Sequence, residues 1–194
     1  MVRFRCWTLV AGLLLSGCAT VAQPPVAGSV ACQADRADSA PGQAWWQSQR
    51  WRYADDAAAQ AAYRALVEGQ SPWPDWFTPA ESTLPAGTRL QMAIGGTQTP
   101  EQPGGFATFD WIGRVADVRD GLAVLMAWKP DVDRVVTYET LQPMPVRIGP
   151  VGPQVDPGTC RLLEGRWSQV QMMIPPAERM RYLRVIDVRP LPAR

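Results

Sequence analysis

Hydrophobic residues recur with a helical period in the first half of the chain. Between Asp55 and Gly69, the apolar side chains that fall on one helical face are Ala59, Ala62, Tyr63, Leu66 and Val67. Asp55 is a residue type that caps a first helical turn, and Gly69 is typical of a helix end. The pattern predicts a helix between these two residues, preceded by a shorter helix that is rich in tryptophan.

Beyond Gly87 the pattern changes to alternation or to short apolar runs, both typical of strands. We expect strands at 89–94, 106–118, 122–128, 134–141, 144–148, 161–174 and 181–188. The run 122–128 predicts a central strand buried on both faces, and the Asp120-Gly121 pair before it predicts a hairpin turn. Prolines on both sides of Met144 predict an edge strand.

These elements define an α+β fold class. We expect one or two N-terminal helices packed on an antiparallel meander sheet, or on a small β-barrel, of about six to seven strands.

The N-terminus has the three-part pattern of an export signal. Arg3 and Arg5 precede an apolar stretch over 6–15, which is shorter than the ~20 residues of a bilayer span and has the length of a signal-peptide core. The next residues, Leu15-Ser16-Gly17-Cys18, resemble the lipobox of bacterial lipoproteins, in which small residues precede the cysteine that becomes lipidated.

This resemblance implies cleavage before Cys18 and attachment of acyl chains, such as palmitate, to its thiol. It also implies an outer-membrane anchor facing the periplasm, because Ala19 is not the aspartate that retains such proteins in the inner membrane. We therefore expect a signal peptide at 1–17, a lipidated and flexible linker at 18–42, and a single periplasmic globular domain at 43–194.

Cys6 would leave with the signal peptide and Cys18 would carry lipid, which leaves Cys32 and Cys160 as free cysteines. In an oxidising compartment such a pair is typical of a disulfide, and the alternative is two unrelated thiols.

Charge and composition exclude several functions. The chain has 19 Lys and Arg residues against 18 Asp and Glu, and loss of the leader with its two arginines leaves a net charge of −1. That balance argues against a nucleic-acid partner, which calls for a basic surface. The chain contains no histidine, which excludes histidine-based catalysis and histidine-ligated metals. The sequence therefore predicts no catalytic residue, metal or cofactor.

Four aspartates remain to be considered as candidates for chemistry: Asp117, Asp120, Asp131 and Asp133. Aspartates next to turns are usually turn formers, and a hydrolase would need two carboxylates set across a cleft.

Two groups of side chains are candidates for a binding surface. Trp73 and Trp76 lie in a proline-rich loop, and tryptophan is favoured both at protein interfaces and in sugar-stacking sites. Arg181 and Arg184 lie near the C-terminus and form the second group. The alternative to a binding role for them is a solvated edge of the sheet. The favoured hypothesis is a non-catalytic domain that binds an envelope protein, of an inhibitor, immunity or assembly-accessory type. The alternatives are a peptidoglycan or glycan binder and a carboxylate-based envelope hydrolase.

Overall fold

The computed structural model describes residues 32–192. The expected signal peptide, the lipobox and Cys18 therefore lie outside the described residues. Within 32–192, none of the helices is long and apolar enough to cross a membrane.

Two helices and a short 3-10 turn open the described chain. They are α1 (Ala40–Gln49), η1 (Arg50–Arg52) and α2 (Asp56–Gly69). The side chain of Asp55 accepts a hydrogen bond from the Ala58 N–H at 2.8 Å, so the predicted helix and its cap are confirmed. The helix ends one residue later than expected, because Gln70 rather than Gly69 adopts the left-handed conformation, with φ of 45°.

The first helix begins at Ala40, inside the segment 18–42 that was expected to be a flexible linker, and includes Pro41 and Gly42. Both residues lie in the first turn of α1, where the missing N–H of a proline removes no hydrogen bond. Ser39 caps this turn by accepting from the Gly42 N–H at 3.2 Å.

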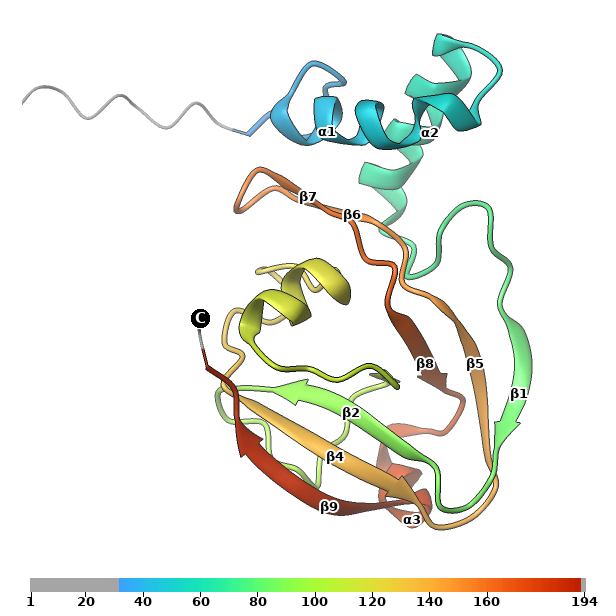
Figure 1. The fold of residues 1–194 in the computed structure, drawn as a ribbon, viewed down its shortest axis with the longest axis vertical. Helices are drawn as coiled ribbons and strands as arrows, with labels where there is room; N and C mark the ends of the chain where they lie inside the picture. The colour runs from blue at the N-terminus through green and yellow to red at the C-terminus, as the bar shows by residue number, and fades with distance from the viewer. Residues whose placement is uncertain (1–31, 193–194) are drawn as a thin grey trace, which may run out of the picture. The chain divides into compact units, whose positions relative to one another are not determined.

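Nine strands of the described residues form three antiparallel sheets. The first sheet has the order β1-β5-β8-β3, and the second has the order β2-β4-β9. A two-stranded sheet, β6-β7, lies beside the helices (Figure 1). The strands are β1 (Ala80–Leu84), β2 (Arg89–Ile94), β3 (Phe106–Ala107), β4 (Arg134–Thr140), β5 (Met144–Pro150), β6 (Gln154–Asp156), β7 (Arg161–Leu163), β8 (Ser168–Met172) and β9 (Leu183–Pro190).

The main core lies between the first and second sheets. Leu90, Met92 and Ile94 project from β2, as their spacing predicts, and meet Val136 and Tyr138 of β4. Met144 and Val146 of β5 and Val170 and Met172 of β8 close the core from the other sheet. Burial of an aliphatic side chain of this size contributes ~1.5–3 kcal/mol, so this core is the main source of stability.

The α+β class is confirmed. The expected meander is not found, because neighbouring strands in the sheets are not consecutive in the sequence. The chain alternates between the two larger sheets, with β1, β3 and β5 in the first sheet and β2 and β4 in the second. As a consequence β5 lies between β1 and β8 and is not an edge strand. Pro145 has no N–H to donate, and its carbonyl accepts a hydrogen bond from the Met173 N–H at 3.0 Å.

The prediction of a central strand at 122–128 is wrong. The hydrogen bonds that the backbone carbonyls of this segment form explain why. Arg119 donates from its guanidinium to the carbonyls of Val124 and Leu125, at 3.0 and 3.2 Å. These bonds replace the ladder that a strand would need. Ala123 has a φ of 47°, which also breaks an extended conformation. Strands β2 and β4 have consecutive buried residues on both faces, and Val135 and Val136 of β4 are fully buried.

The two segments that flank this run also differ from expectation. Only Phe106–Ala107 of the predicted strand 106–118 is extended. The Asp120-Gly121 pair does not form a hairpin, since it belongs to η2, a π-helical turn over Asp117–Gly121. Gly121 is required there by packing, because a Cβ would lie 2.5 Å from the ring of Trp167.

The predicted strand 161–174 is interrupted between β7 and β8, and α3 (Arg179–Tyr182) takes the first residues of the last predicted strand.

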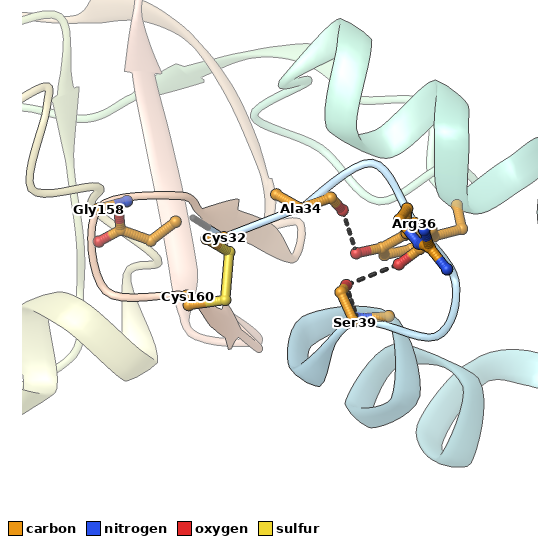
Figure 2. Close-up of a disulfide and its surroundings, with 9 residues drawn as sticks. Cys32, Ala34, Arg36, Ser39, Gly158 and Cys160 are labelled. Carbon is orange, nitrogen blue, oxygen red and sulfur yellow. Dashed lines mark hydrogen bonds between the residues drawn. A yellow bond between two sulfur atoms is a disulfide. The ribbon is translucent and has the colours of Figure 1, made fainter. Parts of the chain in front are cut away.

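A second cluster joins the helices to the β6-β7 hairpin. Trp45, Ala59 and Tyr63 pack with Val155 and are buried. Tyr63 donates its hydroxyl to the Ala34 carbonyl at 2.5 Å. Figure 2 shows the disulfide between Cys32 and Cys160, whose Cα atoms lie 5.5 Å apart. The start of the described chain is therefore held at the β6-β7 turn.

The disulfide generates a stability prediction. The two cysteines are 128 residues apart, and closing so long a loop in the unfolded chain contributes ~3–5 kcal/mol in entropy models. We expect the double variant Cys32→Ser, Cys160→Ser to lose free energy of unfolding in that range in a urea titration. Reductant should shift the wild-type midpoint toward that of the variant and leave the variant unchanged. Equal midpoints for the oxidised protein and the variant would contradict the account.

Candidate functional site

An open groove of about 630 Å³ lies where η1, the 71–79 loop, and the segments around Pro150 and Glu164 meet. We call it the Trp51–Trp76 groove. Its lining residues are Ser48, Gln49, Trp51, Arg52, Pro74, Trp76, Pro150, Val151, Pro153, Glu164 and Arg166. Trp51 is 79% exposed and Trp76 is 61% exposed. Large aromatic surfaces left in water at the rim of a concave surface are typical of a binding site.

Each tryptophan is held in place by its neighbours. The Trp51 indole N–H donates to the Ser48 carbonyl at 2.9 Å, at the end of α1. The Trp76 ring stands edge-on against Phe77, with ring centroids 6.0 Å apart. Phe77 can lie there because Gly149 has no side chain, and a Cβ at that position would lie 2.1 Å from its ring. The rings are therefore positioned before any partner arrives.

A hydrogen-bond network fixes the two segments of the groove to each other. Asp75 accepts from the Arg52 guanidinium and from the Tyr53 hydroxyl, both at 2.5 Å. Arg52 also donates to the Gln49 side chain at 2.9 Å. Because the acceptor belongs to the 71–79 loop and the donors to η1 and the residue after it, the network sets the spacing of Trp51 and Trp76.

The same network shifts the pKa values of its members. Burial raises the pKa of Tyr53 to about 12, and the adjacent Asp75 adds to that effect. Burial also acts to raise the pKa of Asp75, but the hydrogen bonds from Tyr53 and Arg52 outweigh it, so the pKa lies below its ordinary value. Asp75 is therefore ionised, and Tyr53 neutral, at pH 7.

The groove is also lined by two charged residues of opposite sign. Glu164 and Arg166 form an ion pair at 2.8 Å, and both side chains are more than half exposed. An exposed pair of this kind contributes little to stability. It offers a donor and an acceptor to a polar partner beside the aromatic rings.

The predicted binding residues are separated by the fold. Trp76 lines the groove, whereas Trp73 is half-buried and packs on Phe77 with ring centroids 6.2 Å apart. Arg181 lies in α3, at the end of the domain opposite to α1 (Figure 1). Arg184 bonds to Glu139 from its Nε at 3.1 Å, which fits the solvated sheet edge. The arginines therefore do not extend the groove.

Trp51 was not among the predicted binding residues. It follows Trp45 and Trp46 closely in the sequence, and those two tryptophans pack in the helix cluster. The signal that could have found it is its position between Arg50 and Arg52, since flanking charges favour a surface location.

Three of the four aspartates singled out from the sequence, Asp117, Asp120 and Asp133, hold the backbone or an arginine. Asp117 accepts from the N–H groups of Gly113 and Arg114, at 2.8 and 3.0 Å. Asp120 pairs with Arg161 at 2.9 Å, and Asp133 with Arg134 at 2.7 Å. Across 32–192, no cluster of three or more residues of metal-binding type is formed.

A second hollow, of about 480 Å³, lies beside β2 and is largely apolar. Among the residues that line it are Met92, Phe106, Leu122, Val124, Trp128 and Lys129. The side-chain N–H groups of Gln154 and Gln169 donate to the carbonyls of Ser71 and Pro72, whereas the buried side-chain oxygen of Gln154 has no hydrogen-bond partner among the described residues. We call it the Lys129 cavity.

The chain has been compared with known proteins. No family model matches it, and neither does any curated protein. One chain of the structure of Tne2 in complex with Tni2 is 24% identical, over 63% of this chain and 99% of that one, with a TM-score of 0.52. It has a similar fold.

Two further structures show weaker similarity. One is Rhs1-CT in complex with the cognate immunity protein RhsI1, with 17% identity, 59% and 80% coverage of this chain and that chain, and a TM-score of 0.43. The other is Tse6 in complex with Tsi6, with 15% identity, 81% and 98% coverage, and a TM-score of 0.37.

The Asp75 network generates a pH-dependent prediction. The folded-state pKa of Asp75 lies below its unfolded value of about 3.9. The contribution of Asp75 to stability is therefore present above that pH and is lost as the pH falls. We expect Asp75→Asn to lower the free energy of unfolding by ~1 kcal/mol at pH 7, with a smaller difference at pH 3. Urea titrations at both pH values measure this. The exposed Asp187 of β9 supplies a control, Asp187→Asn, and a difference for Asp75→Asn that grows toward low pH would refute the assignment.

Proposed function

We propose that this chain is a lipid-anchored envelope protein whose folded domain binds another protein without chemistry of its own, as an inhibitor or immunity protein does. The observation that carries the proposal is the Trp51–Trp76 groove, where two exposed indoles flank a concave surface. Buried aromatic anchors contribute most of the energy of many protein interfaces, and tryptophan is the residue type most enriched among them.

The construction of the groove supports a protein partner more than a sugar chain. A glycan platform of the expected kind needs Trp73 and Trp76 exposed together, whereas Trp73 is half-buried. The mixed charges of Glu164 and Arg166 at the rim match the polar rim that surrounds the anchors of protein interfaces. In addition, the structure that shares this fold is that of a complex between two proteins.

The membrane anchor is the second part of the proposal, and it rests on the Leu15-Ser16-Gly17-Cys18 segment. Several acyl chains on Cys18 would give a durable attachment, because each buried methylene contributes ~0.8 kcal/mol. The groove would then face a partner in the envelope, with residues between Cys18 and Cys32 as the tether.

The groove generates a binding prediction. We expect Trp51→Ala and Trp76→Ala each to weaken recovery of one specific protein from envelope extracts by about tenfold or more, because each removes a large aromatic contact. The matched control is Trp111→Ala, since Trp111 is also exposed, at 66%, but does not line the groove. Equal recovery by all three variants and the wild type, or recovery of no specific protein, would contradict the proposal. Recovery on sedimented cell-wall sacculi instead would favour the glycan alternative.

The anchor generates a separate prediction. Mass spectrometry of the native protein should show a chain that begins at Cys18 and carries acyl chains, and Cys18→Ser should abolish both processing and labelling with a palmitate analogue. Cys6→Ser is the control and should be processed normally. An unmodified first residue, or retention of residues 1–17, would remove the anchor from the account and leave the groove untouched.

A further inference from the structure

The Lys129 cavity contains a cation without a carboxylate partner. The Lys129 ammonium donates to the Ala93 carbonyl at 2.8 Å and to the Gln98 side-chain oxygen at 2.9 Å. No carboxylate of residues 32–192 forms an ion pair with it. An ammonium has three N–H donors, so these two acceptors leave one donor unused. A partly buried charge held only by neutral acceptors is energetically costly.

A second cation adds to the positive potential. Arg119 donates to four backbone carbonyls, those of Val124, Leu125, Lys129 and Pro130. Burial lowers the pKa of Lys129, and the charge of Arg119 lowers it further. The buried carboxylate of Asp156 acts on Arg119, but it is held by the Met126 and Gly158 N–H groups. Arg119 does not itself line the cavity, so Lys129 is the charged residue of the cavity wall, and Arg119 adds positive potential from outside it.

The rest of the wall is apolar and of ligand size. Met92, Ala107, Leu122 and Val124 contribute to it, and Phe106 and Trp128 are 43% and 50% exposed. Ligand sites commonly enclose ~300–1,000 Å³, with mainly apolar walls and a few placed polar groups, and about 480 Å³ lies in that range.

We propose that the Lys129 cavity binds a small molecule with an anionic oxygen group on an apolar body, with the Lys129 ammonium holding the anion. The charge complements the unpaired cation, and the apolar body covers the wall between Met92 and Val124. The cavity shares only Val151 with the Trp51–Trp76 groove and neither tryptophan lines it, so the proposal does not depend on the proposed protein partner.

A matched pair of probes tests the proposal. We expect the full chain to bind 2-naphthoate about tenfold or more tightly than 2-naphthamide, which has nearly the same shape without the charge, in a calorimetric titration. In Lys129→Met the preference should fall to about threefold or less, while Lys129→Arg should retain it. Methyl NMR should show a shift at Met92 on addition of naphthoate, and none at Met144, which lies in the core away from the cavity.

Three outcomes would overturn the proposal: no naphthoate binding up to millimolar concentration, equal binding of both probes to the wild type, or an unchanged preference in Lys129→Met. The probe comparison in the wild type stands even if a variant fails to fold. Failure here would leave the groove proposal intact, and loss of partner binding in Trp51→Ala would leave the cavity intact.

Discussion

The packing of the two larger sheets against each other is the interaction on which the rest of the structure depends. Met92 and Tyr138 on one side, and Met144 and Val170 on the other, remove a continuous apolar surface from water. Since consecutive strands from β1 to β5 belong to the two sheets in turn, each sheet is assembled from segments that the other sheet separates along the chain. Cooperative burial of this kind leaves the connecting segments free to take irregular conformations, provided that their backbone groups find partners.

Both candidate binding sites arise from those connecting segments. The groove forms where the helices, held to the β6-β7 hairpin by the disulfide and by Tyr63, meet the loop that carries Asp75. The cavity forms where η2 and the residues after it lie beside β2, their carbonyls held by Arg119. In each case a charged side chain organises the irregular backbone, and a rigid sheet supports it.

The sequence could predict the elements whose signals are local, such as the helix capped by Asp55 and the strand 89–94. It could not predict that 122–128 is irregular. The Arg119 guanidinium donates hydrogen bonds to the carbonyls of this segment, and these bonds take the place of strand pairing. The apolar pattern of the sequence does not reveal such a tertiary contact. The candidate site shows the same division. Trp76 was predictable from its proline-rich loop, whereas the exposure of Trp51 depends on where η1 leaves the helix cluster.

The central claim is that the Trp51–Trp76 groove contacts a protein partner in the envelope, and site-specific photo-crosslinking in living cells tests it most directly. A photoreactive phenylalanine in place of Glu164, which is exposed and lines the groove without replacing either tryptophan, should give one dominant adduct of defined mass, while the same group at the exposed Arg64 of α2 should give none. Absence of an adduct at position 164, or the same adducts at both positions, would contradict the account.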